Sequence, residues 1–195
     1  CWTEDALIAP TFDYWLRDGL VEKRKIDLSR VLFIPIFENI IYSLLDCIMK
    51  AWDVLPHVTL DDFYVTDHQN YSSFLGDVHV FLVDNSPLLF HGLQREDVPP
   101  EFQATWDDCN NDRMCRDDLV MILEEIRTLV VPLGETHFPA FYEFIARLRD
   151  MPNANLVDYI QADPFFIRCR ERKLGKVLNI QDFRFVFEGL MYSFS

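Results

Sequence analysis

The sequence predicts an α+β fold that is mainly α-helical and contains one small β-hairpin. Apolar residues recur at i, i+3 and i+4 spacing in two long segments, which is the pattern of helices with one buried face. Two short apolar runs between these segments flank a polar turn, as the strands of a hairpin do. Half of the 195 residues are hydrophobic and 14% are aromatic, enough to bury the core of a single domain.

The first predicted helix begins near Pro35 and continues through FENIIYSLLDCIMKAW, ending before Pro56. A proline in the first helical turn is favourable because its missing N–H would have no partner there. The second helix, DDLVMILEEIRTLVV, starts at an aspartate pair that can cap it. The residues expected in the core are Phe37, Ile40, Ile41, Leu44, Leu45 and Ile48 in the first helix, and Leu119, Ile122, Leu123, Ile126 and Leu129 in the second.

The predicted hairpin pairs Tyr64–Thr66 with Val80–Val83. Between the hairpin and the second long helix, PLLFHGLQREDVPPEFQATWDD has no regular period, so we expect a loop with short helical pieces. HFPAFYEFIARLRDM is amphipathic at helical spacing, and NANLVDYIQADPF predicts a further helix that begins near Asn155. The predicted order is therefore helix, hairpin, long loop, apolar helix and several more helices.

The charge and the absent motifs exclude several classes of function. A formal charge of −14 argues against non-specific binding to nucleic acid or to anionic membranes, and no apolar run is long enough to span a membrane. The phosphate-binding patterns GxGxxG and GxxxxGK[ST] do not occur, and neither do GxSxG and HExxH. Acidity alone does not name a partner, since most surface carboxylates simply keep a protein in solution.

Five cysteines raise the question of a disulfide. Cys109 and Cys115 bracket the polar stretch CNNDRMC, which we expect to be a loop closed by a disulfide between them. The alternative is two free thiols; the five-residue spacing does not suit a zinc site. A disulfide would indicate an oxidising compartment, hence the secretory pathway or the extracellular space, whereas free thiols would allow the cytoplasm.

The stretch VFLVDNSPLLF ends a predicted strand on Asp84. In one interpretation Asp84 accepts N–H bonds in the turn Asn-Ser-Pro that follows, which is the role we favour. In the other, the Asp84 carboxylate is held at the end of the strand to meet a metal ion or a phosphate.

The order of elements and the residues at their joints resemble the C-terminal lobe of protein kinases. VFLVDNS stands where the second strand and the DFG motif would be, PPE resembles APE, DDLVMILEEI resembles the buried helix, and ADPFF resembles an apolar motif near the end of the lobe. The resemblance covers about Phe37 to Phe166. Because of its cysteines, the chain is most similar to divergent secretory-pathway kinases.

The resemblance implies metal-ligand positions at Asp62 and Asp84, which would approach within about 10 Å across the hairpin and hold Mg²⁺ through carboxylate oxygens. No other cofactor is expected. Other catalytic positions differ from those of the family. His57 stands where the catalytic aspartate would be, Thr59 replaces the lysine that contacts the transferred phosphate, and Ser86 replaces the DFG glycine. Phosphate transfer depends on such cations and on positioning, so we expect no efficient catalysis and assign no catalytic residue. As a general base His57 would need a partner in reach; a hydrogen-bonded structural histidine is the favoured interpretation.

The resemblance divides the chain into residues 1–34, an N-terminal extension or remnant, and residues 35–195, a single helical lobe. The sequence begins at Cys1, and we expect a processed or partial chain. In the proposed lobe, Asp117 or Asp118 turns inward and accepts backbone N–H groups from the region around His57 to Leu60.

The function expected is that of a catalytically degenerate kinase-like domain, a pseudokinase, that acts through protein–protein interaction. One alternative is a divergent active phosphotransferase whose nucleotide-binding lobe lies outside this chain. A second alternative is an unrelated acidic helical protein with a regulatory or interaction role.

Overall fold

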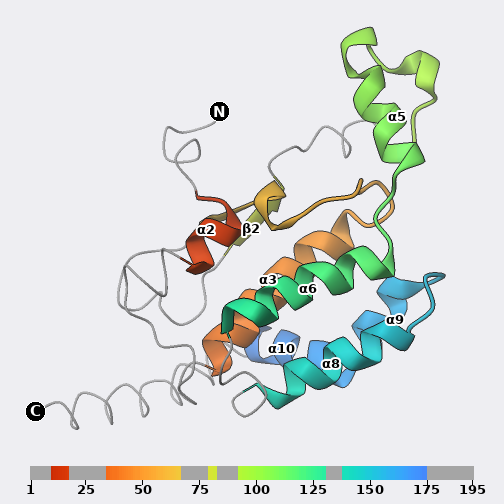
Figure 1. Ribbon diagram of the computed structural model, residues 1–195. Coiled ribbons are helices and arrows are strands. Elements are labelled where there is room, and N and C mark those ends of the chain that lie inside the picture. The colour runs from red at the N-terminus through yellow and green to blue at the C-terminus, as the bar shows by residue number, and fades with distance from the viewer. Residues whose placement is uncertain (1–9, 18–33, 67–78, 83–91, 131–137, 175–195) are drawn as a thin grey trace, which may run out of the picture.

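The computed structural model is mainly helical with one antiparallel hairpin, which confirms the predicted fold class (Figure 1). It describes residues 10–17, 34–66, 79–82, 92–130 and 138–174. These residues form seven α-helices, three 3₁₀ turns and two strands. Within these ranges, none of the helices combines the length and hydropathy needed to cross a bilayer.

Helix α3 (Ile34–Lys50) crosses the middle of the molecule, and all six apolar positions predicted for its buried face are fully buried. Helix α10 (Pro164–Leu174) packs along it, and the rings of Tyr42 and Phe166 stack between the two helices. The amphipathic spacing of α3 thus specified both the helix and the face that it buries.

Helix α6 (Arg116–Val130) is the second long core helix, and α8 (Pro139–Asp150) packs along it. Four of the five predicted core residues of α6 are buried, and Leu129 is half-buried against the core. Helix α9 (Leu156–Ala162) follows α8 and begins after Asn155, whose φ of 60° lies in the left-handed region that asparagine tolerates better than most residues.

Strands β1 (Phe63–Thr66) and β2 (His79–Leu82) form the predicted hairpin. Phe63 pairs with Leu82 and Val65 with Val80, so one face of the hairpin carries apolar side chains toward the core. The alternating pattern fixes this register, because a shift by one residue would expose that face.

The described part of the N-terminal segment lies against β1. The Val65 N–H donates to the Pro10 carbonyl, and Thr11 bridges to Tyr64. The short helix α2 (Phe12–Tyr14) follows, and Phe12, Trp15 and Leu16 are buried in the same core as the long helices. Residues 10–17 are therefore part of the folded body.

Residues 92–111 project from this body and are called the projection below (Figure 1). They contain the 3₁₀ turns η5 (Arg95–Asp97) and η6 (Pro100–Phe102) and helix α5 (Gln103–Asn111). The prediction of short helical pieces is confirmed, but the prediction of a loop from Cys109 onward is wrong. Helix α5 continues to Asn111 because its backbone hydrogen bonds run on to Asp112, whose N–H donates to the Asp108 carbonyl.

Candidate functional site

The candidate site lies where the segment before the hairpin meets the start of α6. Leu55–His57 runs antiparallel to Asp112–Met114, with a bridge between Pro56 and Arg113. The His57 N–H donates to the Asp112 carbonyl at 2.9 Å, and the Met114 N–H donates to the Leu55 carbonyl at 3.0 Å. These two bonds place His57 beside the first turn of α6, although the two segments are far apart in the sequence.

Asp118 joins these two segments through its carboxylate. Its Oδ1 lies 3.0 Å from His57 Nδ1, and its Oδ2 accepts the Cys115 backbone N–H at 2.9 Å and the Cys115 thiol at 3.1 Å. Cys115 is the residue before α6 and Asp118 is the third residue of the helix. The bond from the Cys115 N–H to the Asp118 carboxylate is therefore one of the two bonds of a capping box. The sequence suggested such a tie, but its partner is the His57 imidazole instead of backbone N–H groups.

The surroundings of Asp118 favour its charged form. Burial alone would raise the pKa of this carboxyl, but the two hydrogen bonds from Cys115 and the neighbouring His57 outweigh burial and lower the pKa below its ordinary value. The carboxylate is mostly buried, with 19% of its side chain exposed, whereas the His57 side chain is 45% exposed. A carboxylate with this lowered pKa stabilises the folded chain at neutral pH.

The side chains of Asp118, His57 and Cys115 do not have the arrangement of a nucleophilic triad. In such triads the imidazole lies between the nucleophile and the carboxylate. Here the Cys115 thiol and the His57 imidazole both bind Asp118, which lies between them. The arrangement holds the imidazole and caps a helix, and it does not prepare Cys115 for attack.

Asp117, the other residue expected to tie the segments, points outward. Its side chain is 73% exposed and pairs with the guanidinium of neighbouring Arg116. Arg116 makes the contacts to the rest of the fold: its N–H donates to Asn153 Oδ1 at 2.8 Å and its Nη1 donates to the Met151 carbonyl at 2.9 Å. These bonds fasten the start of α6 to the connection between α8 and α9.

Asp62, the first of the two proposed metal ligands, has a local role. Its Oδ2 accepts the Thr59 backbone N–H at 2.7 Å and lies 3.4 Å from the Thr59 hydroxyl, closing the turn η3 (Leu60–Asp62) before β1. Because Phe63 pairs with Leu82, Asp62 lies at the end of the hairpin where β2 finishes. Asp84 follows β2 two residues later in the sequence. Asp84 itself lies outside the described residues, as does Ser86.

Other acidic side chains gather near η3. The pKa of Glu125 is raised, first by burial and then by the negative charges of Asp13 and Asp61. Within the described part of the chain, no group of three His, Cys, Asp or Glu residues is arranged to hold a metal ion. A Mg²⁺ site at Asp62 therefore stays a prediction that depends on Asp84.

The expected Cys109–Cys115 disulfide is not formed in the structure, because Cys115 is a free thiol that donates to Asp118. The physical reason is the path of the chain. Cys109 belongs to the last turn of α5, and the residues after it leave the helix to pair with Leu55–His57, so the stretch is not a tight loop. Cys47 and Cys169 are also free thiols.

Two further polar clusters were not identified from the sequence. Arg147 of α8 forms a bidentate pair with Asp163, at 2.8 and 2.9 Å, and Asp163 also accepts the Phe165 N–H. In the second cluster the carboxylate of Glu38, 3% exposed, binds Arg168 and Arg172 of α10. The Asp-Pro step of ADPFF was the available signal for the first cluster, since aspartate before a proline often caps a helix.

Comparisons with known proteins give no relative: no family model, no curated protein and no solved structure matches the chain.

Proposed function

We propose that this chain is a protein-interaction domain with a kinase-lobe-like order of elements and without efficient phosphate transfer. The observation that carries the proposal concerns the residues at the positions that resemble a kinase catalytic loop. Their side chains make hydrogen bonds within the fold. The Asp62 carboxylate is engaged by Thr59, and the His57 imidazole is bound to Asp118, which also caps α6.

These contacts weaken the chemistry that a phosphotransferase needs. A ligand for Mg²⁺ must offer carboxylate oxygens to the ion, whereas Asp62 already accepts a short bond from Thr59. The position that resembles the catalytic aspartate holds His57, whose Nδ1 is bound to Asp118, so only Nε2 is left to accept a proton from a substrate hydroxyl. A binding role places no such demand on either residue.

The oxidising compartment expected from the sequence rested on the disulfide. With Cys115 as a free thiol, that support is removed, and a secretory or extracellular location stays a prediction without a structural argument.

Thermal unfolding in the presence of nucleotide tests the proposal. The chain is heated with ATP–Mg²⁺, with ADP–Mg²⁺ and with Mg²⁺ alone, and we expect the same Tm in all three. A nucleotide at 100 times its Kd would add about 2.7 kcal/mol. That gain would raise the Tm by roughly 5–10 °C for a domain of this size.

The Asp62→Asn variant is the matched control, because the amide oxygen can still accept the Thr59 N–H but ligates a cation poorly. A nucleotide-dependent rise in Tm that this variant abolishes, or transfer of labelled phosphate from ATP to any acceptor, would contradict the proposal. Either result would favour the active phosphotransferase.

A further inference from the structure

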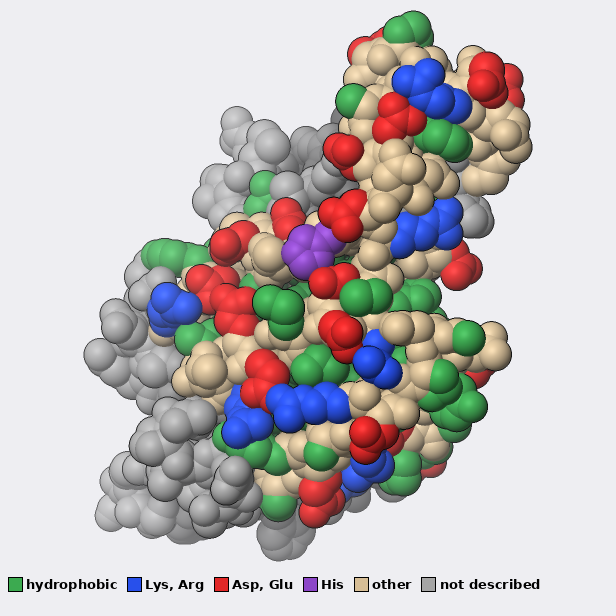
Figure 2. All heavy atoms as spheres, turned by 45° about the vertical axis from the view of Figure 1, so that its right-hand side comes forward, with side chains coloured by type: hydrophobic (Ala, Val, Ile, Leu, Met, Phe, Trp, Pro, Cys, Tyr) green, Lys and Arg blue, Asp and Glu red, His purple; other side chains and the backbone are tan. Residues whose placement is uncertain are grey.

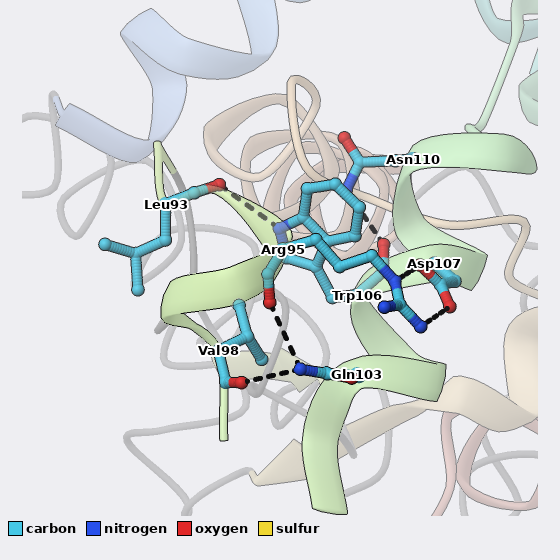
Figure 3. Close-up of polar contacts among 7 residues, drawn as sticks. All are labelled: Leu93, Arg95, Val98, Gln103, Trp106, Asp107 and Asn110. Carbon is cyan, nitrogen blue, oxygen red and sulfur yellow. Dashed lines mark hydrogen bonds and ion pairs between the residues drawn. The ribbon is translucent and has the colours of Figure 1, made fainter. Parts of the chain in front are cut away.

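The projection has a fixed shape although it has almost no core. Among the side chains of this part that the structure describes, Val98 is the buried hydrophobic one, and it lies outside the main core cluster. Trp106 Nε1 donates to the Leu93 carbonyl at 3.3 Å, and Gln103 Nε2 donates to the carbonyls of Arg95 and Val98 (Figure 3). Together these hydrogen bonds hold the turns η5 and η6 against α5.

An ion pair completes this network. Arg95 binds Asp107 through two hydrogen bonds of 2.8 and 3.1 Å, and this pairing lowers the pKa of the Asp107 carboxyl (Figure 3). Asn110 Nδ2 donates to the Trp106 carbonyl, and Arg113, just beyond α5, donates to Asn110 Oδ1. The projection is thereby joined to the segment that pairs with Leu55–His57.

The surface of the projection combines apolar and acidic side chains. Leu93 is 41% exposed and Phe102 is 39% exposed. The stretch contains five acidic residues and one basic residue, Arg95, which is bound to Asp107. The remaining acidic side chains are exposed: Glu96, Asp97, Glu101 and Asp108. Figure 2 shows hydrophobic and acidic side chains on the part that projects at the top of the view, with a basic side chain between them.

We propose that the projection binds a basic segment of another protein that carries apolar side chains. Leu93 and Phe102 would supply the apolar anchors, and the exposed acidic side chains of the projection would attract and orient lysine and arginine residues. Charge complementarity selects this occupant: the projection has a net charge of −4 (one basic minus five acidic residues) on a chain of formal charge −14. This inference rests on the proposed function, since it names the surface and the partner class of a protein-interaction domain.

The same charge disfavours a second copy of the chain as the occupant. A symmetric contact between two projections would bring like charges together, which is destabilising. Contact with an anionic nucleic acid or membrane is disfavoured for the same reason.

Peptide selection tests the proposal on the full chain. A phage-displayed library of short random peptides is selected on the immobilised protein, and enriched peptides are measured in solution by fluorescence polarisation. We expect enriched peptides with positive net charge and at least one aromatic or large aliphatic residue. Their affinity should weaken as salt rises between about 0.05 and 0.5 M, because the attraction is screened.

Three variants of the projection locate the binding site. The Leu93→Ser/Phe102→Ser protein removes the apolar anchors and should weaken binding at least about tenfold. The Glu96→Lys/Asp97→Lys protein should weaken binding mainly through slower association. Trp106→Phe keeps the ring but removes the bond to the Leu93 carbonyl, so an intermediate loss of affinity would show that the fixed shape contributes.

The matched control is Asp158→Lys/Tyr159→Ser, which changes an exposed acid and an exposed aromatic residue on α9 of the body. Circular dichroism and Tm establish that each variant is folded. The proposal is supported if the projection variants lose affinity and the α9 variant keeps it.

Several results would overturn the proposal: no enriched peptides, peptides without positive charge, or equal binding to the wild type and the projection variants. Self-association that the projection variants abolish would assign the surface to a second copy instead. If the α9 variant alone loses binding, the chain still binds proteins but by another surface. The nucleotide experiment judges the proposed function separately.

Discussion

Replacing Asp118 by alanine should lower the free energy of unfolding by about 2–3 kcal/mol. The same replacement at the neighbouring Asp117 should cost less than about 0.5 kcal/mol, because the Asp117 side chain is 73% exposed and pairs on the surface. The two aspartates are adjacent in the sequence and in the first turn of the same helix, so each is the control for the other.

The magnitude follows from the contacts of Asp118. Loss of a negative charge from the first turn of a helix costs up to about 1 kcal/mol, because the charge interacts favourably with the helix dipole. The Cys115 N–H at 2.9 Å loses its acceptor in a site where the carboxylate is 19% exposed, and an unsatisfied donor of this kind costs about 1–2 kcal/mol more. His57 adds little to the loss because its side chain, 45% exposed, can bind water instead.

The pH dependence of this difference is fixed by the lowered pKa of Asp118. A carboxyl whose pKa is lower in the folded than in the unfolded chain stabilises the fold above its unfolded pKa, and the contribution disappears as the pH falls through the folded value. The unfolding free energy of the wild type exceeds that of Asp118→Ala partly because of the Asp118 charge. This charge-dependent part should therefore be constant near neutral pH and decrease below about pH 4.

Urea unfolding followed by circular dichroism measures these values, provided that the slope with urea is the same in all variants. Asp118→Asn is a useful intermediate, since its amide oxygen can accept the Cys115 N–H but carries no charge, and it should lose about 1 kcal/mol. Losses below about 1 kcal/mol for alanine at both positions would refute the reasoning that the Asp118 carboxylate stabilises the start of α6.

Three further predictions concern a buried ion pair and the thiols. Asp163→Ala should lower the unfolding free energy by about 3 kcal/mol, because the buried carboxylate binds Arg147 and accepts the Phe165 N–H. The control is Asp158→Ala at an exposed position of α9, which should change the unfolding free energy by less than about 0.5 kcal/mol. Equal losses for the two variants in urea unfolding would contradict the role given to Asp163. For the thiols, alkylation of the denatured, unreduced protein followed by mass spectrometry should find Cys115 modified, and a Cys109–Cys115 linked peptide would instead restore the argument for an oxidising compartment. In the native protein at pH 8, Cys47, whose pKa burial raises to about 11, and Cys169, whose pKa burial also raises, should react much more slowly than after unfolding.

The helices and the hairpin could be predicted because their signal is local. The positions of α3 from Phe37 to Ile48 and of α6 from Leu119 to Ile126 show the spacing of one buried helix face, and burial follows that spacing directly. The strands around Val65 and Val80 were recognisable from short apolar runs separated by a polar turn. The aspartate pair before α6 was also recognisable as a helix start.

The sequence by itself therefore determined the fold class, the main elements and the core faces, since periodicity is a property of neighbouring residues. Only the tertiary structure decided which partner each polar side chain has. It selected Asp118 over Asp117 and joined it to His57, and it bound Asp163 to Arg147. It also placed the residues after α5 in antiparallel pairing with Leu55–His57, and there the Cys115 thiol donates to Asp118. Hydrogen-bond partners distant in the chain depend on how the packed helices bring segments together, and no local pattern specifies that path.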